Sequence, residues 1–308
     1  NLKALITADI HPYLQQRLEV LGYNVVVKME INRAELLDII ADFDMLIITT
    51  YTKVDKAVID KAVQLKVIGR VGSGMENIDI SYCHQKNIKC INSPEGNENA
   101  VGEHCLAMLL SFMNNINKAN TEIKQNIFLR EENRGEELDG KTIGIIGYGH
   151  TGKAFAKKLR GFDVKMLAYD KYQSISDLNV QPVSLQEIQQ SADIISFHVP
   201  YTSETHHYCN EEFILHCAKT PVIINTSRGA VVDTLAILNA LKNAQIKGCC
   251  LDVFEDEPIT QNKIHPPNIY QEILAFNNVI ATPHIAGWTR ESKLKLVKIL
   301  MDKIEAIL

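Results

Sequence analysis

Three side chains in the second half of the sequence could together move a proton at a carbonyl group. Arg228 offers a permanent cation, Glu257 a carboxylate and His284 an imidazole. Each follows a short apolar run typical of a buried strand, and ligands bind at the carboxyl ends of strands in open α/β sheets. Alone, each residue could equally have a structural role. Together they predict the transfer of a proton and a hydride at a carbonyl group, with a cofactor carrying the hydride.

A glycine-rich turn predicts where that cofactor binds. Gly147, Gly149 and Gly152 form a GxGxxG pattern that follows an apolar run and opens a helical one. The first glycine permits a tight turn, the second lets the backbone approach a pyrophosphate, and the third allows close packing of helix on strand. The N–H groups of His150 and Thr151 begin the helix and would face the phosphates.

Asp170 follows the next apolar run, roughly 20 residues further on, where an acidic residue binds the ribose hydroxyls of a dinucleotide. Its charge would repel a 2′-phosphate, which favours NAD over NADP. The adjacent Lys171 could tolerate that phosphate. The alternative is a structural glycine turn beside a solvated aspartate. Strand, glycines and aspartate together predict an NAD site.

Strands and helices that alternate along the chain must position these side chains. Strand-like runs alternate with helical patterns from Lys3 to Arg70, and a second such series starts at Lys141. Strands separated by helices imply parallel βαβ units with right-handed crossovers. The sequence therefore predicts an α/β protein with two doubly wound parallel sheets, one flavodoxin-like and one a Rossmann NAD-binding domain. We expect the substrate-binding domain to comprise residues 1–98 and 287–308, and the NAD-binding domain residues 99–286.

One long helix is expected between the two series. Apolar residues recur at steps of three and four along Asn99–Asn117, which gives a single apolar stripe. The polar stretch Lys118–Glu137 that follows is expected to be a linker. The stripe could form a two-fold interface with a second copy of the chain, or pack only within its own chain.

Composition argues against several other classes of protein. The chain has 308 residues, of which 46% are hydrophobic and 22% charged, as in ordinary globular proteins. A formal net charge of −5 argues against a binder of nucleic acid or of a membrane surface. The apolar runs are too short to span a bilayer, and we expect no secretory leader. Seven cysteines without metal-like spacing suggest reduced thiols in a cytoplasmic protein and no metal site.

The sequence resembles the D-isomer-specific 2-hydroxyacid dehydrogenases over nearly its whole length, most closely their short phosphoglycerate-dehydrogenase-like members. The resemblance rests on RVGSGMENID from Arg70, NSPEGN from Asn92, GIIGYGHTG from Gly144, TSRG from Thr226, LDVFEDEP from Leu251 and TPHIAG from Thr282. It implies an NAD-dependent enzyme that interconverts a D-2-hydroxyacid and its 2-keto acid, and a C2 homodimer. It also implies that Arg228, Glu257 and His284 form the catalytic trio.

The resemblance assigns a role to each member of the trio. His284 would pass the proton, Glu257 would orient and stabilise the imidazolium, and Arg228 would hold the substrate carboxylate and polarise the neighbouring oxygen. Residues implied near the cofactor are Thr226, Ser227, Asp252 and Gly287, and those implied near the substrate are Arg70, Ser73, Gly74 and Asn97. The backbone N–H groups of Ser73 and Gly74 would form a carboxylate-binding concavity. The side chains of Ser73 and Asn97 could instead serve only as turn formers.

One residue on the expected substrate side departs from the pattern of phosphoglycerate-type members. Phosphoglycerate-type members commonly carry an Arg where this chain has Thr49, at the start of the stretch Thr49–Val54. Other cations that could face a phosphate are Arg70, Lys53, Arg130 and Arg134. The leading expectation is 3-phosphoglycerate, and the alternative is a glyoxylate or hydroxypyruvate reductase. A member of a different class, an NAD-sensing corepressor-like binding protein, would bind NADH without turning over a keto acid.

Overall fold

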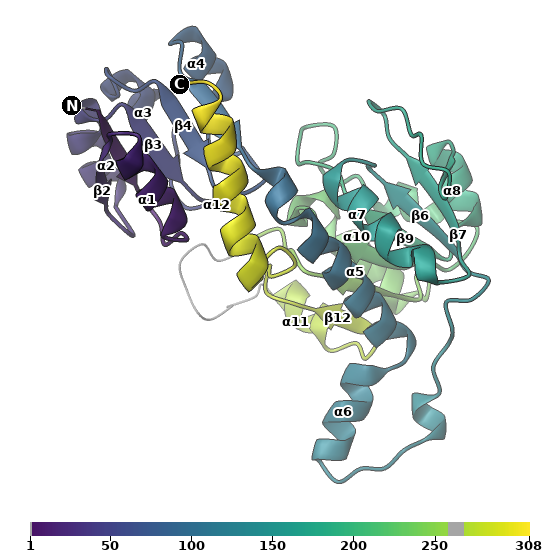
Figure 1. The fold of residues 1–308 in the computed structure, drawn as a ribbon. Coiled ribbons are helices and arrows are strands. Elements are labelled where there is room, and N and C mark those ends of the chain that lie inside the picture. The colour runs from purple at the N-terminus through teal and green to yellow at the C-terminus, as the bar shows by residue number, and fades with distance from the viewer. Residues whose placement is uncertain (1, 258–267) are drawn as a thin grey trace. The chain divides into compact units, whose positions relative to one another are not determined.

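The computed structural model describes residues 2–257 and 268–308, so Pro258 of the LDVFEDEP segment lies outside the described residues. The chain divides into two units, described separately below (Figure 1). Unit 1 comprises Asn1–Asn97 with Trp288–Leu308, and unit 2 comprises Glu98–Gly287. Among the described helices, none is both long and apolar enough to cross a membrane.

Unit 1 is built on a parallel sheet with the strand order β2-β1-β3-β4-β5. Its strands are β1 (Lys3–Ile6), β2 (Asn24–Val27), β3 (Met45–Ile48), β4 (Val67–Arg70) and β5 (Lys89–Asn92). Its helices are α1 (Tyr13–Val20), α2 (Arg33–Ile39), α3 (Lys56–Lys61), α4 (Ile80–Gln85) and α12 (Arg290–Glu305). This strand order is that of flavodoxin-like sheets, which confirms the predicted fold of this unit.

The last helix of the chain completes the core of unit 1. Thr289 caps α12, since its side chain accepts a hydrogen bond from the N–H of Ser292. The apolar face of the helix is buried with α1 on one side of the sheet, while α2, α3 and α4 cover the other side. The buried residues of α12 are Val297, Leu300, Met301 and Ile304.

Unit 2 contains a second parallel sheet, with the strand order β12-β11-β10-β9-β6-β7-β8. Its strands are β6 (Thr142–Ile146), β7 (Lys165–Tyr169), β8 (Gln181–Pro182), β9 (Ile194–Phe197), β10 (Val222–Asn225), β11 (Gly248–Leu251) and β12 (Val279–Ala281). The order reverses between β6 and β9, as in Rossmann sheets, and dinucleotides bind at that point. The predicted second doubly wound domain is therefore confirmed.

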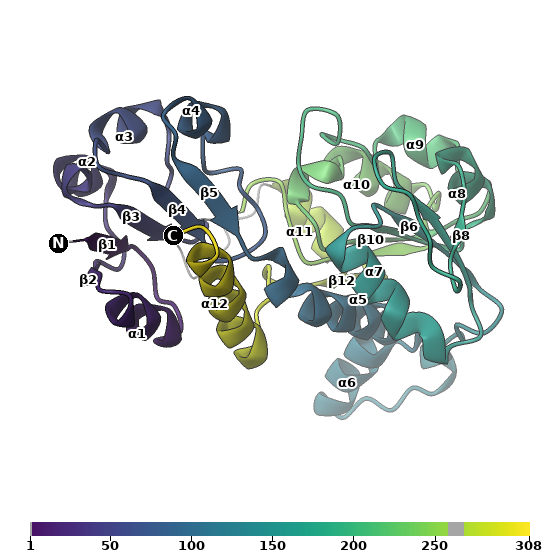
Figure 2. The ribbon, with the colours of Figure 1, turned by 45° about the horizontal axis from the view of Figure 1, so that its top comes forward.

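Helices cover both faces of the second sheet. They are α5 (Glu98–Met113), α7 (His150–Lys158), α8 (Leu185–Ser191), α9 (Glu211–Leu215), α10 (Thr234–Lys242) and α11 (Asn268–Leu274). A further helix, α6 (Ile116–Lys124), buries none of its residues and extends from the rest of unit 2 (Figure 1). Side chains of α5 and α7 share one core layer, and those of α8, α9 and α10 share the other (Figure 2).

The expectation of one helix over Asn99–Asn117 is wrong. Helix α5 ends at Met113, and α6 starts at Ile116 after Asn115, which adopts a left-handed conformation with φ 54°. A left-handed residue cannot continue a right-handed helix, so the chain changes direction there. The stretch expected as a linker is also partly helical, because α6 runs to Lys124. Most of the α5 stripe is buried within unit 2 itself.

Candidate active site

The glycine-rich turn joins β6 to α7 at the carboxyl end of a central strand of unit 2. Gly147 has φ +89°, and a Cβ there would lie 2.5 Å from the carbonyl oxygen of His198. A Cβ at Gly152 would lie 2.2 Å from the carbonyl oxygen of Gly147, so α7 can approach the turn only without that side chain. At Gly149 the nearest atom to a Cβ would be Gln173 Nε2, 3.9 Å away. Two of the glycines are thus required by packing, and the third leaves open backbone that a pyrophosphate can approach.

Asp170, directly after β7, is tied to this turn. Its Oδ2 accepts a hydrogen bond from the N–H of Tyr148 at 2.7 Å, and its Oδ1 accepts from two N–H groups of the following loop at 2.9 Å each. A carboxylate accepts about four hydrogen bonds, which leaves room for a ribose hydroxyl. The neighbouring Lys171 bonds to Glu204 at 2.7 Å, so a carboxylate already competes for its charge.

A histidine that the sequence analysis missed lies under the start of α7. His198 is buried, with Nε2 2.8 Å from Ser196 Oγ and Nδ1 3.1 Å from Thr151 Oγ1. Burial lowers the pKa of His198 to about 3, so the ring is neutral near pH 7 and orients the Thr151 hydroxyl. By contrast, the His150 side chain lies outside the core and pairs with Glu98 at 2.8 Å. The only sequence signal for His198 is its place directly after β9.

The loop after β10 carries Thr226, Ser227 and Arg228, and a buried asparagine shapes it. Asn225 Oδ1 accepts hydrogen bonds from the N–H and the hydroxyl of Ser227, at 3.1 and 2.8 Å, and its Nδ2 donates to the carbonyl of Arg228 at 2.9 Å. Thr226 is buried, with its hydroxyl 3.1 Å from Cys105 Sγ. The sequence analysis did not single out Asn225, although asparagine at the start of a loop is a known turn former.

Asp252, fully buried after β11, holds the loop after β12. Its Oδ1 accepts hydrogen bonds from the hydroxyl of Thr282 at 2.6 Å and the N–H of Ile285 at 2.9 Å. Its Oδ2 accepts from the N–H of Ala286 at 2.8 Å, next to Gly287 at the end of unit 2. His104 Nε2 on α5 also lies 3.6 Å from Oδ1, so this carboxylate anchors the loop after β12 beside α5.

His284 and Glu257 form a hydrogen-bonded pair. The Nδ1 of His284 lies 2.6 Å from Glu257 Oε2, and Glu257 Oε1 accepts from the N–H of Phe254 at 3.0 Å. His284 has φ +54°, an uncommon conformation for a non-glycine residue that is found often at functional sites. Its N–H donates to the carbonyl of Asp252 at 2.8 Å, which holds the backbone in place. The side chain remains 45% exposed, so the second ring nitrogen can meet a substrate.

In unit 1, Arg70 lies at the end of β4 with its side chain buried. Its guanidinium donates to the carbonyl of Val71 at 2.7 Å and to the hydroxyl of Thr50 at 3.0 Å. Gly72 has φ +137°, and a Cβ there would lie 1.7 Å from Arg70 Nη1. The guanidinium therefore occupies space that only glycine at position 72 leaves free.

Ser73 and Asn97, also in unit 1, are brought together. The Ser73 hydroxyl donates to Asn97 Oδ1 at 3.1 Å, and the Ser73 carbonyl accepts from Asn92 Nδ2 at 2.6 Å. Within residues 2–257 and 268–308, the backbone N–H groups of Ser73 and Gly74 donate to no protein acceptor. These two N–H groups are therefore available for an anion.

Comparison with known proteins identifies the class. A family model described as D-isomer specific 2-hydroxyacid dehydrogenase, NAD binding domain, matches residues 106–286. The chain thus belongs to the D-isomer-specific 2-hydroxyacid dehydrogenases, and unit 2 contains the NAD-binding domain of that family. The predicted cofactor, NAD, is confirmed.

Individual relatives carry several enzyme names. The chain is 34% identical over 311 residues to the D-3-phosphoglycerate dehydrogenase of Methanocaldococcus jannaschii, covering 100% of this chain and 57% of that protein. It is 34% identical over 279 residues to the hydroxypyruvate reductase of Thermotoga maritima, covering 91% and 89%. The structure of D-lactate dehydrogenase from Aquifex aeolicus, complexed with NAD and lactic acid, matches with a TM-score of 0.87 and 31% identity, covering 99% and 95%. The chain spans little more than half the length of the first of these relatives.

Proposed function

We propose that this chain interconverts a D-2-hydroxyacid and its 2-keto acid with NAD, and that the substrate pair is 3-phosphoglycerate and 3-phosphohydroxypyruvate. The observation that carries the proposal is the contact of 2.6 Å between His284 Nδ1 and Glu257 Oε2 in the NAD-binding domain. An imidazole held by a carboxylate is the arrangement of a positioned acid–base group.

His284 would act through its second ring nitrogen. Because Glu257 engages Nδ1, Nε2 is the nitrogen left to face the substrate oxygen. During keto-acid reduction the imidazolium would donate its proton to the keto oxygen, and during oxidation the neutral ring would accept the hydroxyl proton. Glu257 would stabilise the charged ring and fix its orientation.

Arg228 would bind the substrate carboxylate. A guanidinium carries its charge at every physiological pH and offers paired donors that match a carboxylate, and it can also polarise the adjacent keto oxygen. The free N–H groups of Ser73 and Gly74 in unit 1 are also suited to a carboxylate.

The groups that would hold NAD lie along one edge of the sheet of unit 2. The N-terminus of α7 would face the pyrophosphate, Asp170 the ribose, and Thr226, Ser227 and Asp252 the nicotinamide end. The open backbone at Gly149, where a Cβ would come no closer than 3.9 Å to another atom, fits the close approach of a phosphate. When bound, NAD supplies or accepts the hydride.

A glyoxylate or hydroxypyruvate reductase is the second candidate. Thr49 stands where phosphoglycerate-type members commonly carry Arg, and its hydroxyl is buried without a hydrogen-bond partner among the described residues. A threonine cannot neutralise a phosphate dianion, which favours a substrate without a phosphate. The nearby Lys53 is an exposed cation that could face a phosphate instead.

A panel of keto acids tests the function and separates these substrates. NADH oxidation is followed with 3-phosphohydroxypyruvate, hydroxypyruvate, glyoxylate and pyruvate under identical conditions. The highest kcat/KM with 3-phosphohydroxypyruvate is expected, and a higher value with hydroxypyruvate or glyoxylate would replace the substrate assignment. NADH binding without oxidation by any of the four would contradict the enzyme and favour the corepressor-like reading.

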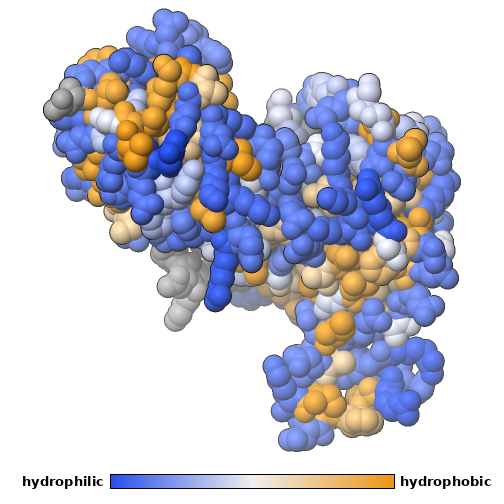
Figure 3. Space-filling view, in the orientation of Figure 1, coloured by the Kyte–Doolittle hydropathy of each residue, from blue (hydrophilic) through white to orange (hydrophobic). Residues whose placement is uncertain are grey.

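We further propose that the chain forms a C2 homodimer through α6 and the loop after it. Apolar side chains gather there, in an arm that extends from the rest of unit 2 (Figures 1 and 3). The exposed ones are Ile116, Ile123, Ile127, Phe128 and Leu129. Exposed apolar clusters of this kind commonly mark protein interfaces.

The mass in solution tests this assembly. We expect a dimer at micromolar concentration by light scattering, and a monomer after Phe128→Asp, because a buried unpaired charge opposes association. The matched control is Leu178→Asp, at an exposed apolar residue of unit 2 outside the arm. A monomeric wild-type chain would contradict the dimer.

A further inference from the structure

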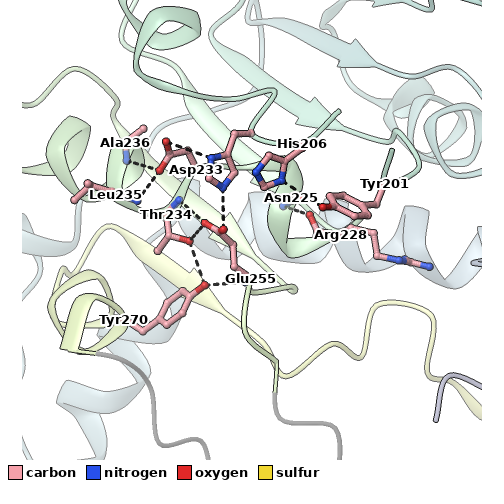
Figure 4. A network of polar contacts seen from close by, with 11 residues as sticks. Tyr201, His206, Asn225, Arg228, Asp233, Thr234, Leu235, Ala236, Glu255 and Tyr270 are labelled. Atoms are coloured by element: carbon pink, nitrogen blue, oxygen red, sulfur yellow. Dashed lines mark hydrogen bonds and ion pairs between the residues drawn. The ribbon is translucent and has the colours of Figure 1, made fainter. Parts of the chain in front are cut away.

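A cluster of charged side chains lies two residues from Glu257. His207, in the loop after β9, lies between two carboxylates: its Nε2 is 2.8 Å from Glu255 Oε2, and its Nδ1 is 3.6 Å from Asp233 Oδ2. Figure 4 labels both carboxylate residues. The three residues could offer metal ligands within 4.8 Å of one another. In the structure each ring nitrogen of His207 faces a different carboxylate. The geometry is that of an imidazole bridging two carboxylates.

Glu255 ties three elements of unit 2 together. Its Oε1 accepts hydrogen bonds from the N–H and the hydroxyl of Thr234, at 2.8 and 2.5 Å, at the start of α10. Its backbone N–H donates to the hydroxyl of Tyr270 on α11 at 2.7 Å. Burial opposes the charged form of Glu255, but hydrogen bonds from Thr234 and His207 outweigh it, so the pKa of Glu255 lies below its ordinary value. Glu255 is thus a fixed, ionised anchor at the centre of the cluster.

The loop that carries Arg228 touches the same segment. A Cβ at Gly229 would lie 1.9 Å from the carbonyl oxygen of Phe254 and 2.5 Å from the backbone nitrogen of Glu255. The two backbones are therefore in direct contact, which only glycine permits. Figure 4 shows the side chain of Arg228 extending away from the cluster, so its loop contributes to the network through the backbone.

A second histidine orients His207. The rings of His206 and His207 stack with centroids 4.0 Å apart and an angle of 19°, and the Tyr201 hydroxyl lies 3.4 Å from His206 Nδ1. The described groups that face His207 are therefore Glu255, Asp233 and the ring of His206. A stacked ring with a carboxylate at each nitrogen has little freedom to turn, so His207 can hold Glu255 in one position.

We propose that His207 and Glu255 are positioning residues that hold the Phe254–Glu257 segment so that Glu257 reaches His284. Neither residue contacts the His284 ring; both would act through Glu257. The Glu257 side chain bonds back to the N–H of Phe254, so a shift of this short segment moves the carboxylate with it. Because it concerns the partner of the proton donor, this inference rests on the proposed function.

The test is a double-mutant cycle between His207→Ala and Glu257→Gln, with two readouts. The first is the titration midpoint of the His284 ring, followed by NMR in the whole protein with NADH bound. The second is kcat for keto-acid reduction. His207→Ala should move the His284 midpoint to lower pH and cut kcat roughly tenfold, as expected when a catalytic group is misplaced. In the Glu257→Gln background, His207→Ala should change kcat less than twofold and leave the His284 midpoint nearly unmoved, since it acts only through Glu257.

Glu255→Gln provides a second variant that keeps the size of the side chain. It weakens the link to His207 and should reproduce the effects of His207→Ala, even if the alanine variant folds poorly. The matched control is Glu272→Gln, which removes an exposed carboxylate that pairs with Lys242 between α11 and α10. This control should leave both readouts unchanged.

Equal effects of His207→Ala with and without Glu257 would overturn the proposal, as would an unmoved His284 midpoint in both His207→Ala and Glu255→Gln. The NMR readout needs no turnover. A wild-type chain that oxidises no NADH would therefore contradict the proposed function, while the His284 midpoints would still decide this inference.

Discussion

Replacing His284 with alanine should lower kcat for keto-acid reduction by roughly 10²–10⁴-fold, the usual effect of losing a positioned acid–base group. NADH affinity should stay nearly unchanged, because the groups that would hold the cofactor are anchored by other contacts. Asp170 is bonded to the glycine turn, and Asp252 holds the loop after β12 through the N–H groups of Ile285 and Ala286. Steady-state kinetics and an NADH titration by fluorescence measure the two quantities separately.

An exposed histidine of the same unit provides the control for this substitution. His216, at the end of α9, should tolerate alanine with wild-type kcat. If His284 served only to shape its loop, alanine would instead weaken folding or NADH binding. A kcat close to that of the wild type in His284→Ala would remove the proton-donor assignment.

Glu257→Gln should lower kcat for reduction less than His284→Ala does, roughly tenfold at the optimum pH. It should also move the pH range over which this kcat falls to lower pH. Reduction needs the imidazolium form of His284, and Glu257 lies 2.6 Å from that ring. Without the negative charge, the charged ring is less stable and loses its proton at a lower pH, so activity is lost earlier as the pH rises. The measurement is kcat against pH for both proteins.

The double variant provides an internal check on this coupling. When His284 is already alanine, Glu257→Gln should cost little more, since the two side chains act as one unit. A limb that stays at the wild-type pH in Glu257→Gln would show that the carboxylate does not stabilise the imidazolium.

Much of the fold could be predicted because its signals are local. The strands Thr142–Ile146 and Lys165–Tyr169 are largely apolar runs, and the first is followed by Gly147, which is the sequence pattern of buried strands. The left-handed conformation of Asn115 could not be predicted in the same way. Asparagine adopts that conformation only in some contexts, and here it divides one expected helix into two.

For the candidate site, the sequence indicated which residues to consider but not what holds them. His198 acts through Ser196 and through Thr151 at the start of α7, and Asn225 acts through the loop that directly follows it. Neither kind of contact leaves a periodic signal in the sequence. His207 and Glu255 are 48 positions apart in the chain, and only the fold brings them together. The roles of Arg228, Glu257 and His284 stay predictions, supported by the contact between the last two.

The pH dependence of the wild-type reaction in both directions tests the central claim most directly. If one imidazole donates the proton during reduction and accepts it during oxidation, the two directions require opposite states of the same ring. With saturating substrates, kcat for reduction should fall as the pH rises, and kcat for oxidation should rise over a neighbouring pH range. The account would be contradicted if kcat changed in the same direction with pH for both reactions, or if both pH dependences persisted unchanged in His284→Ala.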